Sequence, residues 1–65
     1  MKISILPIDV GFDLRALGIP VFLAIHDDVE GIIFKDKHGE TQEVCGSFDE
    51  MRLVLESNGF KVFPA

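Results

Sequence analysis

The sequence predicts an α+β fold in which one main C-terminal helix packs on a four- or five-stranded, mainly antiparallel sheet. Short apolar runs recur along the chain and are separated by glycine or proline about every ten residues, which is typical of strands and turns. A capped, amphipathic pattern near the C-terminus predicts the helix. With only 65 residues, the chain is expected to form a single small domain spanning residues 1–65.

The N-terminal part predicts an edge strand followed by one turn of helix. Residues 2–8, KISILPI, alternate between apolar and polar at first, and Pro7 then removes a backbone donor, so the strand belongs at a sheet edge. Residues 12–18, FDLRALG, are expected to form a helical turn that Asp13 caps and Gly18 ends.

The middle of the chain predicts three consecutive strands that form a meander. Residues 21–25, VFLAI, are apolar without alternation, as in a strand covered on both faces. Residues 32–36 and 41–45 flank KHGE, whose glycine suits the positive φ of a hairpin turn. A last short strand, residues 60–63, ends at Pro64.

The helix is predicted over residues 48–57. Ser47 and Glu50 have the spacing of a capping box at its start, and Asn58 with Gly59 is a typical helix end. At about 100° per residue, the apolar positions of one face are Phe48, Met51, Val54 and Leu55. Leu53 falls on the polar side, so we expect an exposed leucine or a contact with another chain.

Composition indicates that the chain associates with other proteins. Apolar residues and glycine together account for 37 of the 65 residues, or 57%. In ordinary domains the same residue types make up roughly 45–50%. A domain this short buries only about 60% of its unfolded surface. Since all of this apolar surface is not expected to fit inside one monomer, we predict a homo-oligomer, most simply a dimer.

Charge narrows the class of partner. Eleven acidic against six basic residues give a net charge of −5, and the basic residues are scattered. A phosphate backbone needs a basic patch, so nucleic acid is not an expected partner, nor is an anionic membrane surface. The main interpretation of the negative charge is that it keeps an apolar chain soluble. The alternative is that an acidic surface favours encounter with a basic protein.

The expected location is the cytoplasm. The N-terminal apolar run is interrupted by Pro7 and Asp9 and lacks a cleavage site of small residues, unlike a signal peptide. The longest apolar run, IPVFLAI, is shorter than the ~18 residues of a membrane span. A single cysteine, Cys45, fits a reducing compartment.

The segment HDDVEG, residues 26–31, is the part of the chain most similar to a metal-binding or acid–base site. Aspartates favour turns because their side chains bond to the nearby backbone, so a turn between two strands is the main interpretation. A metal site is the rival, with His26 and Asp28 as ligands and a third from His38 or Cys45. The paired spacing of zinc ligands is absent, so we predict no metal or cofactor.

Cys45 is the other candidate for chemistry, because it immediately precedes the helix N-terminus, where a thiol pKa can fall. Arg52 lies too far along the chain for a cysteine-phosphatase loop, and no base is identifiable. A free cysteine is usually a small buried apolar residue, which is the main interpretation here. We therefore predict no catalytic residues.

Two functional hypotheses follow from these features. The first is a small, acidic, non-enzymatic protein-interaction module, for instance an inhibitor or adaptor that binds another protein. Its candidate contact residues are Asp27, Asp28, Glu30 and Leu53. The alternative is a small thiol- or metal-dependent catalyst or sensor centred on Cys45, with His26 or His38 beside it.

Overall fold

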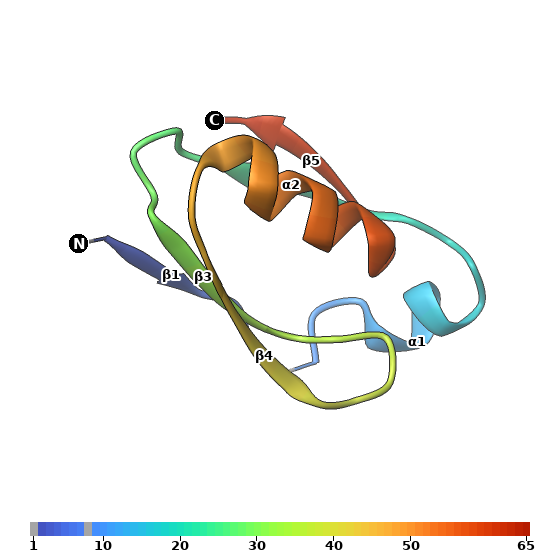
Figure 1. The fold of residues 1–65 in the computed structure, drawn as a ribbon. Coiled ribbons are helices and arrows are strands. Elements are labelled where there is room, and N and C mark those ends of the chain that lie inside the picture. The colour runs from blue at the N-terminus through green and yellow to red at the C-terminus, as the bar shows by residue number, and fades with distance from the viewer. Residues whose placement is uncertain (1, 8) are drawn as a thin grey trace.

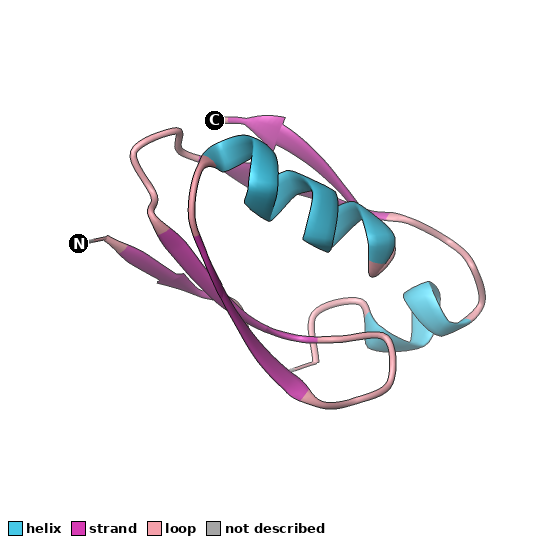
Figure 2. Ribbon diagram, in the orientation of Figure 1, coloured by secondary structure: helices cyan, strands magenta, loops and turns pink. Residues whose placement is uncertain are grey.

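The computed structural model describes residues 2–7 and 9–65, and Figures 1 and 2 show how the chain is arranged. In chain order the elements are β1 (Ile3–Ile5), α1 (Phe12–Ala16), β2 (Val21–Ile25), β3 (Gly31–Lys35), β4 (Thr41–Cys45), α2 (Phe48–Ser57) and β5 (Phe60–Pro64). Ile8, at the end of the first predicted strand, lies outside the described residues. No helix in the described ranges has both the length and the apolarity needed to cross a membrane.

Helix α2 has the predicted bounds and the predicted start. The Ser47 hydroxyl accepts a hydrogen bond from the Glu50 backbone N–H at 3.3 Å, which satisfies one of the free donors of the first turn. Asp49 and Glu50 place negative charge near the positive end of the helix dipole. At the other end Gly59 has φ +89°, the left-handed conformation expected just beyond a helix.

The buried face of α2 is also as predicted. Met51 and Leu55 are fully buried, while Phe48 and Val54 are half-buried and pack against the same core. The helix lies against β5 and reaches β4, so it connects the two parts of the sheet structure (Figure 1). Leu53 is 70% exposed on the opposite side, which confirms its predicted exposure.

The prediction of one mainly antiparallel sheet is wrong. The strands form two sheets, β1-β3-β4 and β2-β5. In the first, β1 is an edge strand, as predicted, and pairs in parallel with β3, while β3 and β4 form the predicted antiparallel hairpin. In the second, β2 and β5 are parallel. The fold is α+β with mixed strand pairing.

The error has a definite cause, because the predicted meander assumed that β2 and β3 pair with each other. Instead, residues 26–30 carry the chain from one sheet to the other. Each parallel pair joins strands that are distant in sequence, as a crossover connection requires. Val21 donates its N–H to the carbonyl of Gly59 at 3.0 Å, and Ala65 donates to Ile25 at 2.9 Å, which ties both ends of β2 to the C-terminal segment.

The turn between β3 and β4 is organised by Asp36. One carboxylate oxygen accepts the backbone N–H groups of His38 and Glu40, each at 2.9 Å, and the other accepts the Gln42 amide at 2.9 Å. These hydrogen bonds, led by that from Gln42, lower the pKa of Asp36. Gly39 has φ +84°, which confirms the predicted glycine of the hairpin turn.

The buried guanidinium of Arg15 joins three elements. It donates to the Lys35 carbonyl at the end of β3 at 2.9 Å, and to the Asn58 carbonyl after α2 at 3.1 Å. Its carbon Cζ lies 4.2 Å from the centre of the Phe60 ring in β5, within cation–π range. Burial lowers the pKa of Arg15, and the nearby Asp36 carboxylate acts in the opposite direction.

Helix α1, which carries Arg15, does not have the predicted cap. Gly11 is its N-cap residue, with φ +59° and no side-chain cap, and Asp13 lies within the first turn. A Cβ at position 11 would collide with the side chain of Val21. Close packing against β2 therefore decides the start of α1 in place of a capping side chain.

Candidate interaction surface

The strand β2 is covered on one face only, contrary to the prediction that both faces are buried. Val21, Leu23 and Ile25 face the core, and Ile25 is buried. The intervening Phe22 and Ala24 are exposed, and Phe22 keeps 72% of its surface in contact with solvent. The apolar run thus includes a face that nothing covers within the described chain.

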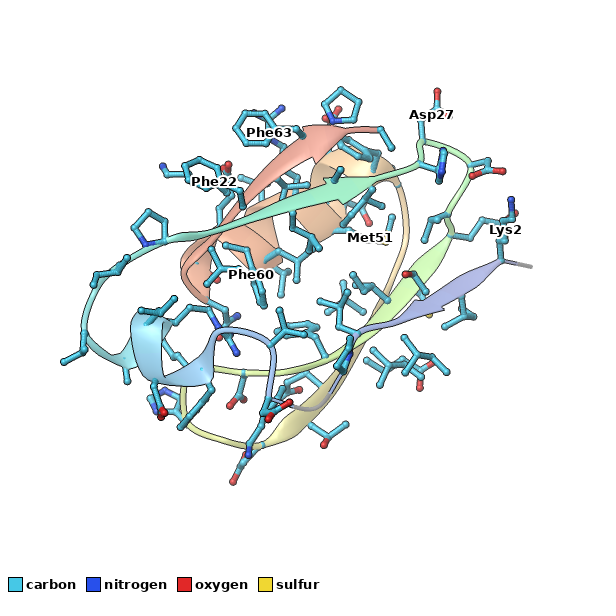
Figure 3. The ribbon with its side chains drawn as sticks, turned by 180° about the vertical axis from the view of Figure 1, so that it is seen from behind. Lys2, Phe22, Asp27, Met51, Phe60 and Phe63 are labelled. Atoms are coloured by element: carbon cyan, nitrogen blue, oxygen red, sulfur yellow. The ribbon has the colours of Figure 1, made fainter. Side chains whose placement is uncertain are left out.

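The partner strand β5 has the same division. Phe60 and Val62 are buried, and the alternate residues Lys61 and Phe63 are exposed. Figure 3 shows Phe22 and Phe63 on one side of the β2 and β5 ribbons and Phe60 on the other. We call the side formed by Phe22, Ala24, Lys61 and Phe63 the outer face.

Two aromatic rings dominate the outer face. The rings of Phe22 and Phe63 are stacked, with their centroids 5.9 Å apart and their planes inclined by 20°. Phe63 is 48% exposed, so the stacking leaves much of both rings in water. Further exposed apolar side chains, Leu17 and Ile19, come just before β2 in the chain. Exposed aromatic residues grouped in this way are typical of protein contact surfaces.

The predicted acidic residues lie in the turn that follows β2. Asp27, Asp28 and Glu30 are all exposed, and Figure 3 shows Asp27 close to the end of that strand. The Lys2 ammonium lies 2.7 Å from the Asp28 carboxylate, and this hydrogen bond lowers the pKa of Asp28. Asp28 is therefore partly neutralised, whereas Asp27 extends into solvent.

The backbone of Glu30 connects this turn to its surroundings. Its N–H donates to the Lys2 carbonyl at 2.9 Å, and its carbonyl accepts from the N–H of Gly46 at 2.9 Å. The acidic turn is thus held next to the start of α2. Leu53 lies on the exposed side of α2, whereas the three acidic residues lie in the turn between β2 and β3.

The expectation of a buried Cys45 is wrong. The thiol is free and exposed at the end of β4, with Sγ 3.7 Å from Oε1 of Glu43. The hairpin register pairs Cys45 with Gly31, whereas His38 lies in the turn at the opposite end. The five residues of β4, at about 3.3 Å each, separate the two ends. The described residues contain no group of three or more His, Cys, Asp or Glu placed to hold a metal ion.

The outer face was missed by the sequence reasoning, although one signal for it is visible. In FKVF, residues 60–63, a strand places Lys61 and Phe63 on the same side because side chains alternate. A solvated lysine therefore indicates that Phe63 is exposed as well. No corresponding signal exists in VFLAI, since none of its residues is polar.

Comparison of the chain with protein-family models, with curated proteins and with solved structures found no match.

Proposed function

We propose that this protein is a small, acidic, non-enzymatic interaction module that binds another polypeptide chain through its outer face. The supporting observation is the stacked pair Phe22 and Phe63, exposed to 72% and 48% on a two-stranded parallel sheet. Aromatic side chains carry much of the binding energy in protein interfaces, because they bury a large area with few rotatable bonds.

The acidic turn gives this surface a preference among partners. Asp27 and Glu30 are exposed beyond the end of β2, and the chain as a whole carries −5. A negative field accelerates encounter with a basic partner and disfavours an acidic one. The proposed partner is accordingly a protein with an apolar patch and basic groups at its border, and the proposed setting is the cytoplasm.

The mode of action is steric. A chain of this size that covers a functional surface of another protein acts as an inhibitor, and one that holds two proteins together acts as an adaptor. Both depend on the same contact residues. Leu53 lies on the exposed side of α2 and is not part of the outer face, so it is not proposed as a contact for this partner.

Affinity capture with the full chain and two variants tests this proposal. Phe22→Lys and Leu53→Lys introduce the same charge at side chains of matched exposure, 72% and 70%. We expect a defined set of proteins to be retained by the unmodified chain and by Leu53→Lys, and to be lost with Phe22→Lys. Equal retention by all three baits would contradict a role for the outer face.

A further inference from the structure

The outer face is a two-by-two array whose members alternate in size. The register of the parallel pair places Phe22 beside Lys61, and Ala24 beside Phe63. The two rings therefore occupy one diagonal, where they stack at 5.9 Å, and the alanine and the lysine occupy the other.

Parallel strands are normally covered on both faces, because crossover connections place other elements over them. Here the core covers one face of the β2/β5 pair, and Phe22 and Ala24 are exposed on the other. The outer face is thus the part of the fold that departs most clearly from this rule, and a layer about 10 Å away would complete the usual arrangement.

We propose that a second copy of this chain supplies that layer, with the two outer faces packed against each other about a two-fold axis. This inference rests on the proposed function, and the second copy covers the same surface when no basic partner occupies it. The diagonal pattern makes the face self-complementary. With the axis along the strands, Phe63 of each copy packs over Ala24 of the other and Phe22 packs over Lys61. With the axis across the strands, Phe22 packs over Ala24 and Phe63 packs over Lys61.

Both contacts are favourable. Ala24 has the smallest side chain of the outer face, so a ring of the other copy can pack over it. An ammonium over a ring face gains cation–π attraction, and Lys61 has the reach to provide it. Two copies aligned in this way bury the rings of Phe22 and Phe63, and the core on the other face of the strands keeps its packing.

Charge also favours this face for self-association. Two copies at −5 repel each other wherever their acidic groups meet. Lys61 is the charged member of the outer face, and β2 contains no charged residue. The acidic turn follows the end of β2, so a two-fold axis across the strands sets the acidic turns of the two copies at opposite ends of the interface.

The available area indicates a weak and reversible dimer. At about 200 Å² for a phenylalanine, the exposed fractions of Phe22 and Phe63 amount to roughly 240 Å² of ring surface. A standard stable interface needs about 800 Å² from each partner, so we expect association that depends on concentration.

Sedimentation velocity of the purified full chain over a concentration series tests this inference. The mean mass should rise from that of one chain towards that of two as concentration increases. Phe22→Lys removes a central ring, and Ala24→Phe fills the recess that receives one. Each should weaken dimerisation by at least ~10-fold, whereas Leu53→Lys should leave it unchanged.

Unfolding curves of each variant establish that it is folded, and Phe22→Lys decides the matter if Ala24→Phe fails to fold. The inference is overturned if the unmodified chain keeps the mass of a single chain at every concentration. It is also overturned if Leu53→Lys weakens association as much as Phe22→Lys. Since this assay contains no other protein, its failure leaves the proposed function standing wherever affinity capture still depends on Phe22.

Discussion

The strands β2 and β3 have similar sequences and opposite surroundings. VFLAI and GIIFK are both five-residue segments rich in apolar residues, and neither shows apolar–polar alternation across its whole length. β3 is the central strand of its sheet, and Ile32 and Phe34 are almost completely buried. Within the described residues β2 pairs only with β5, and its Phe22 is 72% exposed. The comparison teaches that an apolar run specifies how much surface must be covered, while the neighbouring elements decide how much of it one chain covers.

The largest difference in stability between variants should appear when one phenylalanine in each strand is truncated to alanine. Phe34→Ala leaves a cavity in the core and should lower the free energy of unfolding by about 3–5 kcal/mol, close to the whole stability of a domain this small. Phe22→Ala should cost less than about 1 kcal/mol, since the ring contributes mainly its stacking on Phe63.

Denaturant unfolding of both variants, at concentrations low enough to keep the chain monomeric, measures this difference. Equal losses of stability would show that the two strands are equally buried and would remove the contrast between them.

A second large effect should come from Arg15, which holds β3 and β5 in place from outside either sheet. Arg15→Met keeps much of the side-chain volume but leaves the carbonyls of Lys35 and Asn58 without their donors. We expect a loss of about 2–4 kcal/mol in the free energy of unfolding, from two charge-assisted hydrogen bonds and the contact with Phe60.

Arg15→Lys is the matched control for charge. A lysine retains the positive charge but lacks the planar fork that reaches two carbonyls at once, so most of the loss should persist. Full recovery of stability by Arg15→Lys would show that charge alone accounts for the effect.

Parts of this architecture follow directly from the sequence, and they are the local parts. The cap at Ser47, the buried face of α2 and the hairpin glycine Gly39 each depend on residues within a few positions of one another. Strand pairing is not local. The parallel contacts of β1 with β3 and of β2 with β5 join distant segments, and apolar runs fit several pairings equally well.

The candidate surface shows the same limit. The exposure of Asp27 and Leu53 could be predicted, because charge and helical periodicity both indicate it. The burial of Arg15 and the exposure of Cys45 could not, since both depend on where distant elements lie. Phe22 and Phe63 form one surface only because their strands pair in parallel in one particular register.

A third prediction concerns how acidic pH changes the free energy of unfolding through Asp36, the residue that follows β3. Hydrogen bonds lower the folded-state pKa of Asp36, so its stabilising contribution is complete above the unfolded pKa of about 3.9. That contribution should disappear as pH falls through the lower pKa of the folded state. Unfolding measured across the acidic range should show this loss in the unmodified chain, and Asp36→Asn should reduce it.

Asp28 titrates in the same direction because Lys2 lowers its pKa, so Asp28→Asn is the appropriate comparison. If stability falls with acid identically in Asp36→Asn and in the unmodified chain, the turn contacts of Asp36 do not contribute.

The smallest effect is expected at Cys45. Because the thiol is exposed, Cys45→Ser should change the free energy of unfolding by no more than about 0.5 kcal/mol. A thiol reagent should react with the folded chain nearly as fast as with the unfolded chain. A thiol that reacts only after unfolding would show that Cys45 is protected, in contrast to its position in the structure.

The central claim is that the outer face of β2 and β5 is uncovered in one chain and covered by another. Backbone amide NMR spectra of the pure protein, recorded over a concentration series, test it most directly. The account predicts progressive shifts at Phe22, Ala24, Lys61 and Phe63, with Leu53 unchanged. Shifts that gather around Leu53, or no change at any residue, would contradict it.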